Sequence, residues 1–345
     1  MPHSPASDNP PPATGTHSWQ RWNRWVLSIV IVVALGVVGM NVFIDPYQVF
    51  RLVPYRNGFT PNELDNKYMW LNKHPEQTEF LLLGSSRTGI WDPRWFDHNG
   101  QRISYNFSKL AARPTDIAQL LPALKATGLT PRHIILGIDI FPFLEHPGDR
   151  GPAHYPPPFI SGESRFTFLA RYFFLASFVP SALRLKHAMA EQPELLFDFS
   201  TGLYRTPGLI RRRAKDPAAY DAKEYAPIKA RIAERALSSR ELHALDEIAQ
   251  WCHDNHVDTR VFIHPHHPVI QAQVGQHNLA TLAAEVQKRF PDAWDFTHAT
   301  DTCGAEAYLD KKHYTPAIAR QLQKIITQKY RNVHFSSFSP AYFCS

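Results

Sequence analysis

The sequence predicts an α/β fold: a three-layer domain with a mainly parallel sheet, preceded by one transmembrane helix. Two observations predict it. Short apolar runs alternate with amphipathic helical segments along much of the chain, and a long uncharged apolar segment lies near the N-terminus. The 345 residues suffice for about two domains or one large α/β unit. With 44% hydrophobic and 20% charged residues, the composition excludes a wholly disordered chain, a coiled coil and a collagen-like fibre.

Residues 26–44 are predicted to form the transmembrane helix, because they carry no charge and just span a hydrocarbon core of about 30 Å at about 1.5 Å per residue. Three interfacial tryptophans and two arginines precede them, namely Trp19, Trp22, Trp25, Arg21 and Arg24. The positive-inside rule then predicts a cytoplasmic Pro-rich tail over residues 1–25 and a periplasmic main domain, in a single-pass protein of the bacterial inner membrane. A cleaved signal peptide is the alternative, but the length of the apolar segment and the lack of an A-x-A site favour a retained anchor.

After the anchor, residues 45–75 are expected to form an irregular juxtamembrane segment, residues 76–335 the α/β domain, and residues 336–345 a C-terminal tail. Five apolar runs are typical of strands and three segments have helical spacing: strands at 79–83, 102–107, 133–139, 259–263 and 293–296, and helices at 115–127, 279–290 and 316–330. This alternation is typical of a parallel sheet covered by helices.

The alternation breaks between about residues 145 and 240, which we interpret as an insertion in the α/β domain. A Pro/Gly-rich stretch comes first, followed by a strongly apolar segment at 166–185 and then a basic, helix-prone region. Arg171 and Pro180 interrupt the apolar segment, so a second transmembrane helix is not expected. The segment is equally consistent with a lid, a surface lying on the bilayer, a dock for a membrane partner, or a helix packed on the sheet.

The charge and the cysteines limit the classes of partner and of fold. The formal net charge of +6 is modest and lies partly in one basic run, residues 211–215, so a face toward anionic lipid or polymer is permitted and nucleic acid is not expected. Cys252, Cys303 and Cys344 are scattered, which excludes a disulfide scaffold and a zinc ribbon. Whether Cys252 and Cys303 pair stays open, since an oxidising periplasm would allow it.

Polar residues that follow the predicted strands are the candidate site, because ligands bind beyond the carboxyl ends of strands in open α/β sheets. Asp310 lies three residues before His313 in the loop that enters the last helix, where its carboxylate can fix the tautomer of the imidazole. The hydroxyl that His313 would deprotonate comes from the turn after the first strand, which carries Ser85 and Ser86. Backbone N–H groups of such a turn can face a developing oxyanion. The alternative is a pair of capping serines, an Asp at a helix N-terminus and a surface His.

With G-S-S-R at residues 84–87 and L-D-K-K-H at residues 309–313, the chain resembles the SGNH (GDSL-like) hydrolase superfamily, whose first block is more commonly G-D-S and whose last is D-x-x-H. It resembles in particular membrane-anchored, extracytoplasmic members that acylate cell-surface polymers, such as alginate O-acetylation proteins and the teichoic-acid D-alanylation protein. An N-D-P-Y-like start at residues 41–47, G-I-D and W-D-F-T occur in a similar order, and the resemblance spans about residues 41–330 outside the insertion.

The resemblance implies a Ser-His-Asp triad with Ser86 as nucleophile, His313 as base and Asp310 as its partner. It also places the oxyanion-hole positions at Ala111, where the family has Gly, and at Asp139, where it has Asn. We expect the backbone donor at Ala111 to survive only if the local φ is negative. An ionised Asp139 cannot donate a hydrogen bond, so it is either protonated, or binds the acceptor sugar, or is structural.

Four more residues near the strand ends are candidates for oxyanion or substrate binding: Arg87, Ser108, His264 and His266. Arg87 either positions an acidic group or forms a salt bridge. The H-P-H-H-P run at residues 264–268 offers histidines that could bind zinc, but no Asp, Glu or Cys shares their spacing. The resemblance implies instead a Pro-rich loop that lines the substrate cleft. We therefore expect neither a metal nor another cofactor.

These observations predict a membrane-anchored periplasmic serine acyl-transfer enzyme that O-acetylates an exopolysaccharide, such as cellulose or alginate, through an acyl-Ser86 intermediate. The expected partners are a membrane-bound O-acyltransferase or a polysaccharide synthase complex, together with the polysaccharide acceptor. A polysaccharide deacetylase or esterase uses the same chemistry, with water as the acceptor. The alternative from another class is a non-catalytic SGNH-like subunit of a polysaccharide synthesis and export complex.

Overall fold

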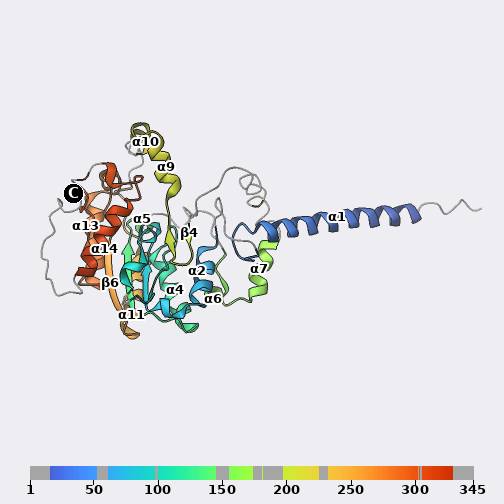
Figure 1. The fold of residues 1–345 in the computed structure, drawn as a ribbon, viewed down its shortest axis with the longest axis horizontal. Coiled ribbons are helices and arrows are strands. Elements are labelled where there is room, and N and C mark those ends of the chain that lie inside the picture. Colours follow the sequence, from blue (N-terminus) through green and yellow to red (C-terminus); the bar gives the residue numbers. More distant parts are fainter. Residues whose placement is uncertain are drawn as a thin grey trace, which may run out of the picture.

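Five parallel strands form the central sheet of the structure, a computed structural model (Figure 1). It describes residues 16–52, 61–97, 100–144, 155–173, 181, 197–224, 232–301, 303 and 305–328. The strand order is β2-β1-β3-β6-β7, with β1 at Phe80–Leu83, β2 at Ser104–Asn106, β3 at His133–Ile138, β6 at Asp258–Ile263 and β7 at Trp294–Asp295. All five fall on the predicted runs, so the α/β class with a mainly parallel sheet is confirmed.

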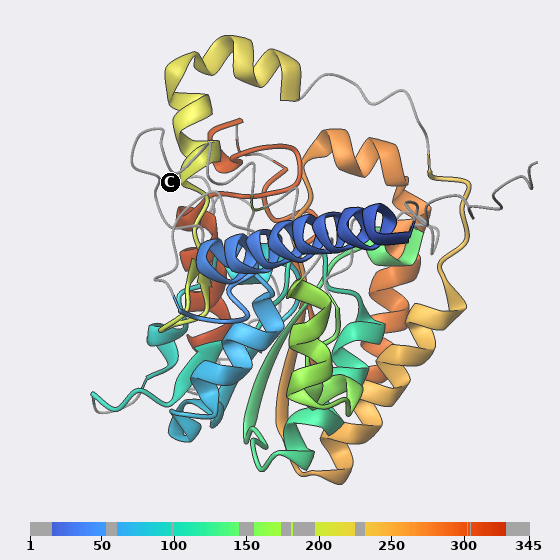
Figure 2. The same cartoon turned by 90° about the vertical axis from the view of Figure 1, so that its right-hand side faces the viewer.

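The two faces of the sheet bury separate hydrophobic clusters, because successive side chains of a strand point to opposite faces. Leu81 and Leu83 pack in the first cluster with α4 (Pro114–Ala126), α11 (Ser239–Asp254) and α13 (Gln276–Arg289). Phe80 and Leu82 pack in the second cluster with α14 (Pro316–Gln328). Figure 2 shows the red helix α14 and the orange helices α11 and α13 on either side of the strands. The helices predicted at 115–127, 279–290 and 316–330 are thereby confirmed.

The remaining elements are short and connect the strands. They are α2 (Glu63–Leu71), η1 (Pro75–Thr78), α3 (Ser86–Gly89), η2 (Pro93–Phe96), α5 (Phe141–Leu144), α6 (Pro158–Ser161), α9 (Pro207–Lys215), α10 (Pro217–Glu224), α12 (Pro268–Val274) and η3 (Ala305–Ala307). Helix α2 corrects the expectation of a wholly irregular segment at 45–75. Its N-cap is Asn62, whose side chain accepts from the backbone N–H of Asp65, and Glu63 and Asp65 lie in its first turn.

Helix α1 (Thr16–Ile44) projects from the rest of the described chain (Figure 1). Its segment Trp19–Ile44 is long and apolar enough to cross a membrane. The helix begins earlier than the predicted start at residue 26, so the second part of the predicted tail at 1–25 is helical. The reason is that backbone hydrogen bonding continues through the interfacial tryptophans. The first part of that tail and the predicted C-terminal tail, 336–345, lie outside the described residues.

The insertion contributes a β-hairpin and, at the base of α1, a helix. The hairpin pairs β4 (Phe197–Asp198) with β5 (Leu203–Tyr204) in antiparallel fashion. Helix α7 (Arg165–Phe173) covers the start of the apolar segment and packs against α1, where the Asn41 side-chain amide donates to the Phe173 carbonyl at 3.0 Å. This part of the segment therefore docks at the base of the anchor and not on the sheet. Much of the remaining insertion lies outside the described residues.

Cys252 is a buried free cysteine of α11 and so does not pair with Cys303.

Candidate active site

The structure brings Ser86, His313 and Asp310 together at the carboxyl end of the sheet. Ser86 Oγ lies 2.8 Å from His313 Nε2, and His313 Nδ1 lies 2.9 and 3.0 Å from the two carboxylate oxygens of Asp310. Ser86 is half-buried, whereas His313 and Asp310 keep 17% and 14% of their side-chain surface exposed. An imidazole bound to a carboxylate through one nitrogen and to a hydroxyl through the other can remove the proton of that hydroxyl.

The loop before α14 fixes the carboxylate of Asp310. Its Oδ1 accepts from the backbone N–H groups of Lys312 and His313, both at 2.7 Å. Burial works to raise the pKa of Asp310, but the hydrogen bonds from the His313 side chain and from these N–H groups outweigh it and hold the pKa below its usual range. Asp310 is therefore ionised at neutral pH and can stabilise an imidazolium on His313.

A tight turn after β1 presents Ser86. Gly84 adopts φ = +143°, and a Cβ there would lie 2.3 Å from Thr88 Oγ1 and 2.8 Å from the Gly137 carbonyl oxygen. Only glycine fits this backbone. Ser85 caps the following short helix α3, because its Oγ accepts from the Arg87 N–H at 3.2 Å. Ser86 is then the first residue of α3.

A buried hydroxyl joins this turn to the loop that carries His313. Tyr314 is fully buried, and its hydroxyl donates to the Arg87 carbonyl at 3.1 Å and accepts from Trp91 Nε1 at 2.7 Å. His264 Nδ1 lies 2.9 Å from the same hydroxyl, and His264 Nε2 lies 3.1 Å from Thr88 Oγ1. Because Tyr314 gives its single proton to Arg87, we assign the ring proton of His264 to Nδ1, so that Nε2 accepts from Thr88.

Asp139 and Arg87 form a buried ion pair behind the nucleophile. Arg87 Nη1 donates to Asp139 Oδ1 at 2.8 Å, the Ser85 hydroxyl donates to Asp139 Oδ2, and Arg87 Nη2 donates to the Pro265 carbonyl. Burial works to raise the pKa of Asp139, but Arg87 and the hydrogen bond from Ser85 hold it well below its usual range. Of the three alternatives for Asp139, the structure supports the structural one, since the carboxylate is ionised, paired and only 7% exposed. Arg87 forms the salt bridge.

Two backbone N–H groups, those of Ser86 and Ala111, are candidates for binding an oxyanion. In the described part of the chain, neither the N–H of Ser86 nor that of Ala111 donates to a protein acceptor. The loop after β2 that carries Ala111 is joined to the turn after β1 by a hydrogen bond from the Lys109 N–H to the Gly84 carbonyl at 3.0 Å. Ala111 has φ = +53°, so the condition of a negative φ, under which the donor was expected to survive the change from Gly to Ala, is not met. The alanine adopts the left-handed conformation that Gly would favour, at a cost of about 1–2 kcal/mol.

Three predicted binding residues lie in the interior. His264 and His266 are 0% and 1% exposed, so they do not line a cleft as predicted. Both follow β6 and are covered by the loops of the neighbouring strands. Ser108 is 2% exposed, and its hydroxyl and N–H both donate to the Asn106 side-chain oxygen. The Asn106 amide in turn donates to the carbonyls of Thr88, Gly89 and Trp91, so Ser108 completes a structural network around α3.

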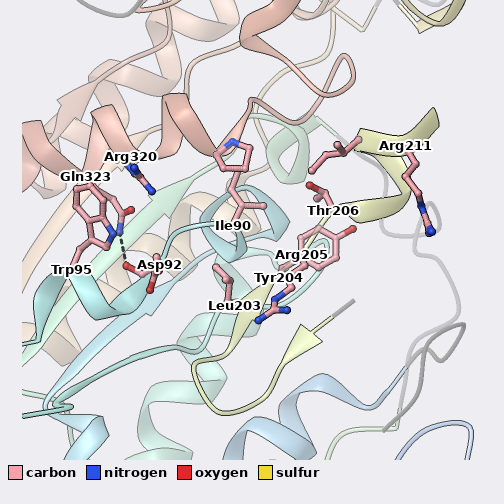
Figure 3. A pocket seen from close by; sticks show the side chains of 12 residues that line it. Ile90, Asp92, Trp95, Leu203, Tyr204, Arg205, Thr206, Arg211, Arg320 and Gln323 are labelled. Atoms are coloured by element: carbon pink, nitrogen blue, oxygen red, sulfur yellow. Dashed lines mark hydrogen bonds between the residues drawn. The ribbon is translucent and has the colours of Figure 1, made fainter. Parts of the chain in front are cut away.

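A pocket of about 500 Å³ lies between α14, the segment after α3 and the hairpin strand β5, and none of Ser86, Asp310 and His313 lines it (Figure 3). Ile90 and Pro316, which follow Ser86 and His313 closely in the chain, line it together with Tyr204 of β5. Its polar side chains include three arginines against one aspartate, and its full lining is Ile90, Asp92, Trp95, Leu203, Tyr204, Arg205, Thr206, Ile210, Arg211, Pro316, Arg320 and Gln323. The guanidinium of Arg320 lies over the Trp95 ring, 5.1 Å from its centroid, and no ion pair of the described residues involves Arg320.

Within the described ranges, no group of three or more His, Cys, Asp or Glu side chains is placed to hold a metal ion.

Comparison with known proteins adds no relative: no family model matches the chain, and no curated protein matches it significantly.

The sequence analysis missed four residues that shape the site, namely Glu63, Lys67, Thr88 and Tyr314. Tyr314 directly follows the D-x-x-H block, but nothing in its sequence context separates a buried hydrogen-bonded hydroxyl from a core aromatic ring. Glu63 and Lys67 lie at i and i+4 behind Asn62, and that N-cap pattern with acidic residues in the first turn would have predicted helix α2.

We predict that Asp139→Asn lowers the free energy of unfolding by about 3–5 kcal/mol, because it leaves the guanidinium of Arg87, 3% exposed, without its counter-charge. Urea denaturation of the full-length protein in detergent measures this. Asp246→Asn is the control, because Asp246 pairs with Arg289 but is 52% exposed; it should cost less than about 1 kcal/mol. Equal losses in the two variants would contradict a charged, buried Arg87–Asp139 pair.

We also predict that the buried histidines make the fold sensitive to acid. Burial lowers the pKa of His264 to about 3 and that of His266 well below its usual range, so below about pH 6.5 the unfolded chain binds more protons than the folded one. Stability therefore falls as the pH drops from about 6.5 toward 3, and each such histidine contributes about 1.4 kcal/mol per pH unit.

His266→Leu tests this at one position. Among the described residues, neither ring nitrogen of His266 has a hydrogen-bond partner, so removal of the ring should not weaken the fold at pH 8. It should reduce the slope of the unfolding free energy between pH 4.5 and 6 by about 1.4 kcal/mol per unit. His277→Leu, at an exposed position of α13, should leave the slope as in the wild type. An unchanged slope in His266→Leu would mean that His266 is not buried in its neutral form.

Proposed function

We propose that this chain is a membrane-anchored serine acyl-transfer enzyme with an SGNH-type active site. The observation that carries the proposal is the relay in which Asp310 binds His313 Nδ1 and His313 Nε2 lies 2.8 Å from Ser86 Oγ. The free N–H groups of Ser86 and Ala111 support it, because acyl transfer passes through an oxyanion that such donors stabilise. A structural role alone would not require a half-buried hydroxyl at this point of the fold.

The first half-reaction acylates Ser86. His313 takes the hydroxyl proton as Ser86 Oγ attacks the carbonyl carbon of an acyl donor, and the carbonyl π electrons move to the oxygen. The resulting oxyanion is bound by the two backbone N–H groups, while Asp310 stabilises the imidazolium. When the oxyanion collapses, the bond to the leaving group breaks and His313 returns the proton to that group. An ester on Ser86 remains.

The second half-reaction transfers the acyl group, with acetyl as the proposed group, to a hydroxyl of a polysaccharide. His313 removes the proton of the sugar hydroxyl, whose oxygen attacks the acyl-Ser86 carbonyl carbon to give a second oxyanion. When this oxyanion collapses, the bond between the acyl carbon and Ser86 Oγ breaks, and His313 returns the proton to Ser86 Oγ. We propose that this acceptor binds in the pocket lined by Ile90 and Pro316, which follow Ser86 and His313 by four and three residues in the chain. Tyr204 and Trp95 offer aromatic surface, and Arg320 offers unpaired donors for a carboxylate or hydroxyl group.

The N-terminal apolar helix supports a location of the proposed enzyme at a membrane. One helix long enough to span a membrane precedes the domain, and the arginines before it favour a cytoplasmic N-terminus and a periplasmic active site at the inner membrane. A membrane-bound O-acyltransferase or a polysaccharide synthase complex is the proposed partner, because a domain held at the bilayer can receive an acyl group as it crosses.

We predict that a fluorophosphonate probe forms one adduct with the full-length protein in detergent, on Ser86. Ser86→Ala should abolish the adduct, and His313→Ala should slow its formation by at least about 10³-fold, because the triad residues act as a unit. Asp310→Asn should slow it by about 10²–10⁴-fold, since the imidazole loses its orientation. Intact mass and peptide mapping measure these changes.

Ser85→Ala is the matched control on the neighbouring hydroxyl and should still form the adduct at Ser86. No adduct on the folded wild-type protein would contradict the enzyme and favour a non-catalytic subunit. If the adduct forms but, in the presence of polysaccharide, the donor's acetyl groups are released only as acetate, the protein is an esterase or deacetylase.

We further predict that Arg320→Gln raises the KM for an acidic acceptor, oligomeric alginate, by about tenfold, because the variant loses one charge-assisted hydrogen bond to the acceptor. With p-nitrophenyl acetate as donor, acetylated oligosaccharide is measured by mass spectrometry. The KM for cello-oligosaccharides should change less, and the rate of Ser86 labelling should not change. Arg132→Gln, with a side chain 80% exposed at the opposite end of the sheet, is the control. Equal effects of the two variants would place the acceptor elsewhere.

A further inference from the structure

Helix α2 carries two buried side chains of opposite charge that contact the loop with the proposed second oxyanion donor. Glu63 and Lys67 lie one turn apart and are 6% and 0% exposed. Glu63 Oε2 accepts from the Leu110 N–H at 3.0 Å, and Lys67 Nζ donates to the Ser108 carbonyl. The two side chains thus bind one backbone donor and one backbone acceptor within the three residues that precede Ala111.

This arrangement explains how an alanine keeps a left-handed conformation. The loop after β2 is irregular, and the Ser108 carbonyl and the Leu110 N–H find their partners on α2 and not in a strand. Glu63 and Lys67 satisfy two of those groups and thereby fix the peptide planes on the N-terminal side of Ala111. The next N–H, that of Ala111, keeps no protein partner, and φ at this residue is +53°. Contacts with α2 therefore impose a backbone conformation that the local sequence disfavours by about 1–2 kcal/mol.

The charges of the pair depend on each other. Burial lowers the pKa of Lys67 to about 8, and the carboxylate of Glu63 opposes this shift. Burial raises the pKa of Glu63, opposed by Lys67 and by the Leu110 N–H. Two desolvated groups of opposite charge persist here because each also binds the backbone of the loop.

The other side of α2 is fixed to the base of the anchor. Asp65 is 1% exposed and forms ion pairs with Arg51, which follows α1, and with Arg165, which begins α7. The Asn62 N–H donates to the Tyr47 carbonyl at 2.8 Å. Helix α2 therefore connects the membrane-proximal residues with the loop that carries Ala111.

We propose that Glu63 and Lys67 are positioning residues of the active site: by binding Leu110 and Ser108 they hold the Ala111 N–H where the oxyanion forms. This rests on the proposed acyl-transfer function. Neither side chain touches the reacting atoms, so both act on the transition state through the loop and leave probe binding unaffected.

Saturation kinetics of Ser86 labelling by the fluorophosphonate probe, on the full-length protein in detergent, test the proposal. Glu63→Gln keeps an acceptor for Leu110 but leaves Lys67 without a counter-charge. Lys67→Met removes the donor to Ser108, and the double variant Glu63→Gln/Lys67→Met restores neutrality without restoring that donor. We expect Lys67→Met and the double variant to lower the maximal labelling rate at least about tenfold with the half-saturating probe concentration unchanged, as for a displaced oxyanion donor.

Asp65→Asn is the matched control, because it removes a buried carboxylate from the same helix on the side away from the loop. It should lower the melting temperature but keep the maximal labelling rate within about twofold of the wild type. Hydrogen exchange is the second readout: amides of residues 108–112 should exchange faster in Lys67→Met and in the double variant, and not in Asp65→Asn.

The outcomes separate the two proposals. Suppose that the wild-type protein is labelled at Ser86 and that the folded variants react at the wild-type rate. This result overturns the positioning role of Glu63 and Lys67 and leaves the acyl-transfer function intact. Faster labelling with protected loop amides also overturns it. A folded wild-type protein that does not react at Ser86 overturns the acyl-transfer function and with it the catalytic purpose of the pair.

Discussion

The buried ion pair of Arg87 with Asp139 holds together the ends of three neighbouring strands. Arg87 follows β1, Asp139 follows β3, and the Pro265 carbonyl that accepts from Arg87 follows β6. Desolvating such charges is costly, and the cost is offset here because both carboxylate oxygens accept hydrogen bonds within the pair and from Ser85. The turn that presents Ser86 is consequently fixed from behind, which a nucleophile requires if its hydroxyl is to stay within reach of a base.

Parts of the chain far apart in sequence meet at this fixed turn. His313 contacts Ser86 although most of the α/β domain lies between them in the sequence. The next residue, Tyr314, donates to the Arg87 carbonyl, so the same short segment supplies the imidazole and fixes its position. Beneath them, His264 accepts from Thr88 and donates to Tyr314, which the neutral ring can do and the imidazolium cannot. Burial of the histidines thus serves the geometry of the triad and makes the fold sensitive to acid.

The site is also connected to the membrane-proximal part of the chain. Helix α2 binds Arg51 and Arg165 on one side and the loop before Ala111 on the other, so the residues at the base of α1 and this loop contact the same helix. In the proposed function, this shared helix would fix the orientation of Ser86 relative to α1. The pocket with Arg320 and Trp95 is bounded partly by the insertion, so the part of the chain with the least regular sequence pattern contributes to the proposed acceptor site.

The sequence by itself determined the parallel sheet, the long apolar N-terminal helix and the segments that carry Ser86, Asp310 and His313, because hydrophobic periodicity and short-range spacing are local properties. It did not determine what surrounds a polar side chain. Asp139 has the same sequence context whether it is protonated, binds sugar or pairs with Arg87; His264 and His266 look alike as cleft or core residues; and the left-handed φ of Ala111 depends on Glu63 and Lys67. Only the tertiary structure decided these points, since burial, ion pairing and the partners of irregular backbone arise from contacts between distant segments.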